Sequence, residues 1–263
     1  MDVRQLIALT FVTLLTPVMC GVIIIWTPPA VGGGQIHTLD CSAGSLTGWT
    51  QVGNGGSSVD LVSGECLGNL SKNAEDPSVL NDIDLDTTDN FGSMKVVTIA
   101  GGNSNKIEII LRAPALPGVH YACIFNNNGN NWAVERHGDD HGFISEIKGV
   151  DHCSCGPWFD VNPGNWIGCT VEGEGFGTNE STNTRVNWWN WGTSLPGGGF
   201  DIQDSSTWTS TGLKCTCTAA DIDTLSPSDF LVDVAGACGP ESTGLTSKEI
   251  LYDDFTCGDI PQP

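Results

Sequence analysis

Basic residues are scarce in this chain. Its 263 residues include only 10 Lys and Arg against 31 Asp and Glu, which gives a formal net charge of −21 at pH 7. A surface that binds nucleic acid needs a basic patch, because neutralised phosphates release their counterions. The composition therefore excludes nucleic acid as a partner.

Charged residues of either sign are also few, at 16% of the chain, and helical patterning after the N-terminal leader is limited to one short turn predicted over 226–234. The 34 Gly, together with abundant Ser, Thr and Asn, are typical of turns and strands. Hydrophobic residues make up 39% of the chain and include 9 Trp and 9 Phe. That much apolar surface can fill a core, which excludes wholesale disorder.

Residues 1–20 are predicted to be a signal peptide or a membrane anchor. A basic start at Arg4 is followed by an apolar run over 6–18, which is the pattern of a secretory signal. If the run continues through Trp26, it is about 20 residues long and sufficient to span a membrane. Pro17 interrupts the longer run, which favours the signal peptide.

Cysteine usage also indicates an oxidising compartment. Of the 11 Cys, one lies in the leader, and the even number that follows predicts up to five disulfides in a secreted or cell-surface protein. These ten are Cys41, Cys66, Cys123, Cys153, Cys155, Cys169, Cys215, Cys217, Cys238 and Cys257. We expect Cys41 to pair with Cys257, because the first and last strands of a sandwich are commonly neighbours. Two sequons, at Asn69 and Asn179, predict N-glycosylation on the same route.

From residue 36 onward, short β-type runs are separated by Gly- and Asn-rich turn signals. The run 106–112 places Ile107 and Ile109 on one face and Glu108 and Ile110 on the other. The other principal runs are 58–63, 94–100, 119–125, 132–136, 166–172, 185–191 and 249–256. Residues 36–263 are therefore predicted to form one all-β domain that is cross-linked by disulfides.

The chain resembles the concanavalin A-like, laminin G-like jelly-roll superfamily over about residues 36–257. Such domains open with a strand near a Trp, here 46–52, and close with an Asp-Asp-Phe strand, here 250–255. The runs that lie between them in the same succession are 59–65, 106–112, 121–136 and 164–169. The resemblance implies an antiparallel jelly-roll β-sandwich with a concave face that relatives use for glycans. It leaves the function open, because lectins, glycosidases and structural modules share this fold.

A catalytic carboxylate pair is not recognisable. Retaining glycosidases of this superfamily would show a Glu-x-Asp-x-(x)-Glu strand, with two carboxylates about 5–5.5 Å apart. The nearest candidates, Glu146 with Asp151 and Glu172 with Glu174, lack the middle Asp and the spacing. A Ser nucleophile elbow, G-x-S-x-G, is also missing. We therefore predict that the protein is not an enzyme.

A calcium site is predicted at 81–86. If this segment is a strand, Asp82, Asp84 and Asp86 share one face, where three carboxylates repel one another unless a cation separates them. The extracellular calcium concentration is high enough to fill weak sites made of oxygen ligands. The alternative is a solvated edge strand whose charges deter edge-to-edge pairing.

The most conspicuous aromatic cluster comprises Trp188, Trp189, Asn190 and Trp191. On a strand, Trp189 and Trp191 share one face and Trp188 lies on the other. Tryptophan rings stack on sugars and Asn amides bind hydroxyls, so whichever face is exposed is predicted to bind glycans. In the alternative, the rings fill the core.

Residues 21–35 are predicted to be an apolar N-terminal strand followed by a Pro/Gly hinge. Its apolar residues, Val22, Ile23, Ile24, Ile25 and Trp26, could pair within their own domain or add to the sheet of another copy, which would produce a filament. The leading hypothesis is a non-enzymatic extracellular structural or adhesive subunit that self-assembles through this strand. The alternative is a secreted lectin-like carbohydrate-binding module, with calcium as a candidate cofactor. Glycoside hydrolysis is the third candidate.

Overall fold

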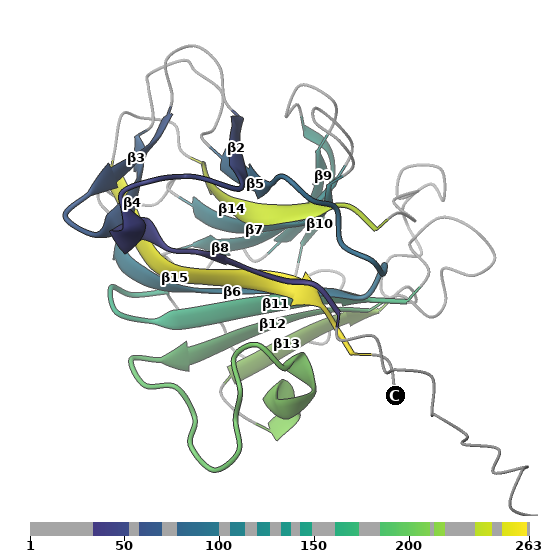
Figure 1. Ribbon diagram of the computed structural model, residues 1–263. Helices are drawn as coiled ribbons and strands as arrows, with labels where there is room; N and C mark the ends of the chain where they lie inside the picture. The colour runs from purple at the N-terminus through teal and green to yellow at the C-terminus, as the bar shows by residue number, and fades with distance from the viewer. Residues whose placement is uncertain are drawn as a thin grey trace, which may run out of the picture. The chain divides into compact units, whose positions relative to one another are not determined.

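Two antiparallel sheets form the fold (Figure 1). The computed structural model describes residues 34–52, 58–69, 78–99, 106–113, 120–126, 133–137, 143–148, 161–173, 185–210, 213–218, 235–243 and 249–261. Within these ranges the regular structure is fifteen strands and two short 3-10 helices, and no helix is long and apolar enough to cross a membrane. The predicted leader, the strand at 22–26 and the turn at 226–234 lie outside the described residues.

The eight-stranded sheet, here sheet A, has the order β13–β12–β11–β6–β15–β4–β3, and β1 pairs with β15 beside β4. Its strands are β1 (Ile36–Leu39), β3 (Ser58–Val62), β4 (Glu65–Asn69), β6 (Asn90–Ile99), β11 (Trp166–Glu172), β12 (Arg185–Gly192), β13 (Leu213–Thr218) and β15 (Glu249–Asp259). The long strand β15 therefore has neighbours on both sides: β6 on one, β4 and β1 on the other.

The seven-stranded sheet, here sheet B, has the order β10–β9–β8–β7–β14–β5–β2. Its strands are β2 (Trp49–Val52), β5 (Ser78–Asn81), β7 (Lys106–Ala113), β8 (His120–Asn126), β9 (Ala133–His137), β10 (Phe143–Lys148) and β14 (Ala237–Thr243). In Figure 1, β2 and β9 rise on either side of β14 and β7, so the sheet curves around the face that lies away from sheet A. The all-β sandwich implied by the jelly-roll resemblance is confirmed.

The main core lies between the sheets and follows the period-two pattern of the strands. In β7, Ile107 and Ile109 are buried in this core, whereas Ile110 belongs to a separate cluster on the opposite face of sheet B. In β12, Trp188 is fully buried in the same main core. The predicted division of both strands into two faces is confirmed.

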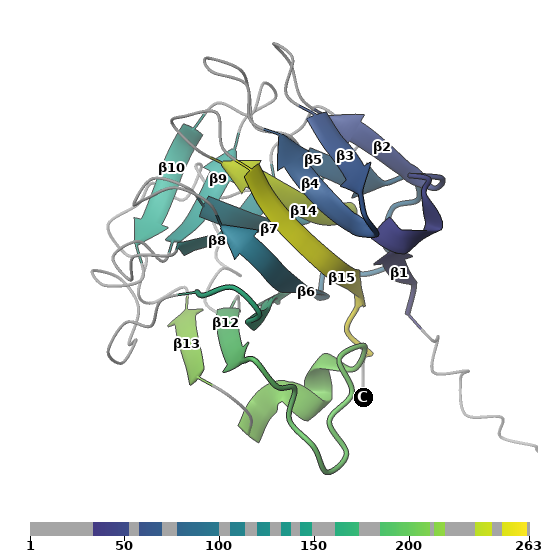
Figure 2. The same ribbon diagram turned by 90° about the vertical axis from the view of Figure 1, so that its left-hand side faces the viewer.

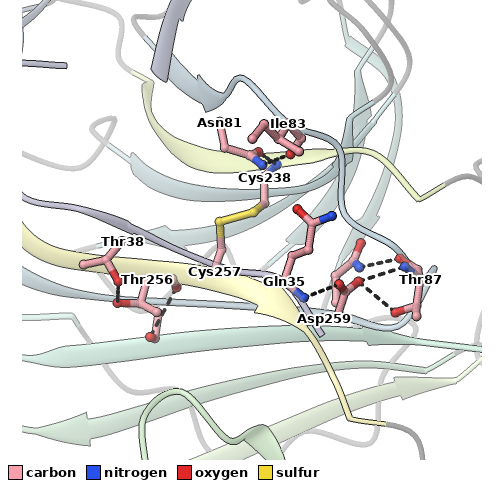
Figure 3. The surroundings of a disulfide bond; sticks show 11 residues. Gln35, Thr38, Asn81, Ile83, Thr87, Cys238, Thr256, Cys257 and Asp259 are labelled. Atoms are coloured by element: carbon pink, nitrogen blue, oxygen red, sulfur yellow. Dashed lines mark hydrogen bonds between the residues drawn. A yellow bond between two sulfur atoms is a disulfide. The ribbon is translucent and has the colours of Figure 1, made fainter. Parts of the chain in front are cut away.

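Within the described part of the chain, two disulfides join the sheets through this core. Cys123 of β8 bonds Cys169 of β11, and Cys238 of β14 bonds Cys257 of β15. Figure 3 shows the second bridge, which spans the space between β14 and β15. A third disulfide joins Cys41, in the 3-10 helix η1 (Cys41–Ala43), to Cys66 of β4.

The predicted Cys41–Cys257 pairing is therefore wrong, although its premise holds. The first and last strands are neighbours: Leu39 pairs with Phe255, and His37 pairs with Cys257. The side chain of Cys257 points into the core between the sheets, so its partner comes from the opposite sheet. Cys41 lies beyond the end of β1 and meets β4 instead.

Candidate functional site

The tryptophan cluster predicted to bind glycans is buried. Trp188, Trp189 and Trp191 are 0%, 2% and 7% exposed. Trp188 lies in the main core, and Trp189 and Trp191 lie on the outer face of sheet A in a second core with Trp208 and Phe91. The alternative, in which these rings pack into a core, is the one that the structure adopts.

This second core is covered by the segment that follows β12, drawn in green in Figures 1 and 2. The segment ends in the 3-10 helix η3 (Ser205–Ser210), which supplies Trp208. The Trp208 ring meets Trp191 edge to face at 4.9 Å and Trp189 at 5.2 Å between centroids. Its backbone carbonyl accepts a 3.0 Å hydrogen bond from Trp189 Nε1. The covering segment is thus fixed by aromatic packing and hydrogen bonding, and we call it the cap (residues 193–210).

Asn190 also has a structural role. Its side chain is 6% exposed, donates to Asn165 Oδ1 at 3.2 Å and accepts from the backbone N–H of Gly192 at 2.8 Å. These bonds hold the end of β12 against the turn before β11. Buried amides need such partners because unpaired ones are costly.

The predicted calcium site does not assemble. Strand β5 ends at Asn81, so Asp82, Asp84 and Asp86 are not on one strand face. The Asp82 carboxylate accepts from Thr50 Oγ1 at 2.5 Å, and Asp86 accepts from Gln35 Nε2 at 2.8 Å. Among the described residues, no group of three or more His, Cys, Asp or Glu side chains could hold a metal ion.

Other predicted residues have separate positions. The backbone of Asn69 lies at the end of β4, opposite Ser58 on one side and Glu249 on the other. Glu172 is partly buried and accepts a 3.0 Å bond from Arg185 Nη2, as part of a surface ion pair. Cys215 and Cys217 lie in β13 and Glu146 lies in β10, where the backbone alone is described. Asp151, Cys153, Cys155, Glu174, Asn179 and the strand at 22–26 lie outside the described residues.

The sequence analysis missed a pair of carboxylates on the outer face of sheet B. Glu108 in β7 lies directly opposite Glu241 in β14, and both side chains are fully buried. On its other side Glu108 faces Ile124 of β8, which is also fully buried. The alternation within β7 had already placed Glu108 on this face, but only the register of β14 brings Glu241 to it.

A fully buried arginine lies on the same strand as Glu108. Arg112 donates from Nε to Thr88 O and from Nη2 to Gly173 O, each at 2.5 Å, and its Nη2 is 3.9 Å from Asp89 Oδ1. It adopts a φ of 55°, in the left-handed region that non-glycine residues rarely occupy. These partners flank β6 and β11 of sheet A, so Arg112 ties the end of β7 to the other sheet. Leu80 and Ile110 belong to a small apolar cluster on the outer face of sheet B, which therefore combines the two glutamates with apolar side chains.

No family model and no curated protein matches this chain. Among solved structures, it is similar to a carbohydrate-binding module, CBM66 from Bacillus subtilis (15% identity, TM-score 0.46, 81% of this chain and 96% of that one). It is also similar to the Ca2+-bound exoplasmic/lumenal domain of VIP36 (11% identity, TM-score 0.48, 86% and 91%). A third is a prokaryotic β-1,3-1,4-glucanase (lichenase) derived from a mouse hindgut metagenome (8% identity, TM-score 0.45, 87% and 100%).

These findings correct the filament hypothesis. By their descriptions, the similar structures include a carbohydrate-binding module and a glucanase. The three disulfides among the described residues indicate an oxidising, extracellular or lumenal compartment. Identities of 8–15% limit the likeness to the fold.

Proposed function

We propose that this chain is an extracellular carbohydrate-binding protein whose glycan site is the outer face of sheet B. The observation that carries the proposal is the buried pair of Glu108 and Glu241 at directly opposite positions of the two central strands. The jelly-roll resemblance implies the same use of a curved sheet face.

Side chains directly opposite on antiparallel strands have Cβ atoms about 4.5–5.5 Å apart. The two carboxyl groups therefore lie together at one point on the outer face of sheet B. A few polar groups that converge among apolar side chains are characteristic of ligand sites.

A sugar matches the chemistry of this face. Sugar hydroxyls donate hydrogen bonds to carboxylates, and the apolar face of a pyranose ring packs on aliphatic side chains such as Ile110 and Leu80. Because Glu108 and Glu241 are fully buried, a glycan reaches them only when this face opens. Binding that requires such a change has a lowered association rate, so we expect slow association.

The test is binding to an array of neutral and acidic oligosaccharides, followed by kinetics on the best ligand. We expect Glu108→Gln and Glu241→Gln each to weaken binding at least tenfold while the thermal melting temperature is maintained. Glu65→Gln, on β4 of the other sheet, is the matched control and should bind like the unmodified protein. Unchanged binding by both variants would show that the glycan site lies elsewhere.

The register of the two glutamates favours one further candidate, glycoside hydrolysis. Retaining glycosidases use two carboxyl groups about 5–5.5 Å apart, one as acid and base and the other as nucleophile. Directly opposite residues on neighbouring strands provide this order of spacing. Release of reducing sugar from the bound oligosaccharide, abolished in either Gln variant, would support hydrolysis. Stable binding without turnover would leave carbohydrate binding as the function.

A further inference from the structure

A row of three side chains crosses the outer face of sheet A, away from the Glu108–Glu241 pair. Trp166 of β11 lies opposite Lys95 of β6, and Lys95 lies opposite Asp253 of β15. Their sequence neighbours Ile167 and Tyr252 are buried in the main core. By strand alternation, the row therefore faces outward.

Trp166 is the member of this row with an aromatic surface in reach of solvent. It packs against the second core beneath the cap but remains partly exposed, unlike Trp189 and Trp191. Lys95 Nζ lies 6.0 Å from the centroid of the Trp166 ring, within cation–π range. The contact orients the ring and keeps an ammonium donor beside it.

Next to the row, β15 has an irregular backbone. Its register against β6 shifts between Asp253 and Thr256, and Asp254 adopts a φ of 51°. Partial burial raises the pKa of the Asp254 carboxyl, Asp253 and Asp40 raise it further, and Lys95 opposes them. A bulge that aims an acid out of the ladder at an energetic cost is a feature found next to binding sites.

We propose that Trp166, Lys95, Asp253 and Asp254 form a second sugar-binding site, which takes a pyranose ring of a neutral glycan. The proposal rests on the proposed carbohydrate-binding function. The ring of Trp166 stacks on the apolar face of the sugar, and the carboxylates and the ammonium bind its hydroxyls.

Charge selects the class of glycan. The site combines the carboxylates of Asp253 and Asp254 with the ammonium group of Lys95. Asp40 lies close enough to raise the pKa of Asp254, and the whole chain carries a net charge of −21. An acidic sugar would be repelled at this site. A polysaccharide molecule is long enough to extend beyond a single binding site. Two sites on opposite sheets would therefore allow one protein molecule to link two polysaccharide molecules.

The experiment measures stoichiometry and affinity for cellohexaose, laminarihexaose, mannohexaose and xylohexaose by titration calorimetry. The Trp166→Ala variant should show only one of the two binding events, or its affinity at the second site should fall at least tenfold. Trp166→Phe retains a ring and should lose less, which keeps the test valid if the Ala variant folds poorly. Trp49→Ala removes a partly buried tryptophan of β2 in sheet B and serves as the control, with both events retained.

The Asp254→Asn variant distinguishes a role of Asp254 in sugar binding from a role in folding stability. Because the folded protein raises the pKa of Asp254, ionisation opposes folding, and the Asn variant should be more stable at pH 7. The same variant should bind the hexasaccharide more weakly, a combination that a purely structural role would not produce.

The outcomes are distinguishable. Binding that is lost with Glu108→Gln but unchanged in Trp166→Ala and Asp254→Asn would overturn the second site and preserve the proposed function. If the unmodified protein binds no oligosaccharide, acidic ones included, both proposals fail. A preference for acidic over neutral oligosaccharides at the Trp166 site would also overturn the assignment.

Discussion

Asp259 binds Thr87 through two hydrogen bonds. Its Oδ1 accepts from the Thr87 N–H at 2.8 Å and from Thr87 Oγ1 at 2.9 Å. The other carboxylate oxygen accepts from the N–H groups of Gln35 at 2.7 Å and Asp86 at 3.1 Å. Figure 3 shows Asp259 between Gln35 and Thr87, at the end of β15. One carboxylate therefore ties β15 to the residue before β1 and to the segment after β5.

Asp259→Asn should lower the free energy of unfolding by about 2 kcal/mol, because hydrogen bonds to a charged acceptor contribute about 1.5–3 kcal/mol each and the amide retains one acceptor oxygen. Urea denaturation at neutral pH measures the change. Asp60→Asn, at an exposed position of β3, is the control and should have little effect. Equal stability of the two variants would contradict the role assigned to Asp259.

His37 should make the protein less stable in mild acid. Burial lowers the pKa of His37, and the nearby Asp259 only partly opposes this. The unfolded chain therefore binds a proton at His37 more readily than the folded protein does. The contribution of neutral His37 to the free energy of unfolding is fully present above the unfolded-state pKa of about 6.5, and it is lost as the pH falls through the folded-state pKa. His37→Gln should flatten the fall in urea midpoint between pH 7.5 and pH 5. Parallel curves for the two proteins would refute this origin.

Gly168 should not tolerate a methyl group. A Cβ at this position would lie 2.6 Å from the Trp191 ring and 2.9 Å from the Trp208 ring. Overpacking of this kind costs about 1–3 kcal/mol. Gly168→Ala should therefore lower the melting temperature, and tryptophan fluorescence should report a disturbed second core. Gly197→Ala, where nothing lies within 4 Å, is the matched control, and a loss of similar size there would contradict the packing argument.

The disulfides Cys123–Cys169 and Cys238–Cys257 should differ modestly in their contributions to the free energy of unfolding. Loop-closure entropy assigns about 4 kcal/mol to a bridge that closes a 46-residue separation, Cys123–Cys169, and about 3 kcal/mol to one that closes 19 residues, Cys238–Cys257. Replacing each pair by Ala and measuring denaturation would test this order. A larger loss for the shorter loop would show that core packing outweighs chain entropy.

Much of the fold follows from local sequence patterns. Alternation with period two assigned Ile107 and Ile109 to the core and Glu108 to the other face, and it separated Trp188 from Trp189. Such patterns are visible in sequence because each strand carries its own two faces. The oxidising compartment followed from the cysteine count in the same way.

The candidate sites depended on contacts between distant segments. Alternation identifies the face of a strand, but it does not identify what covers that face, so the burial of Trp189 and Trp191 by the cap was invisible in the sequence. Glu108 became half of a pair only through the register of β14.

The sequence by itself determined the all-β class, the strand faces and the oxidising compartment, since these are local or compositional properties. Tertiary structure alone decided that Cys41 bonds Cys66, that Asp82 and Asp86 are held apart, and that Trp166 stays at the surface. These outcomes depend on strand order, register and the packing of layers. Each of them is a long-range property, which no single segment encodes.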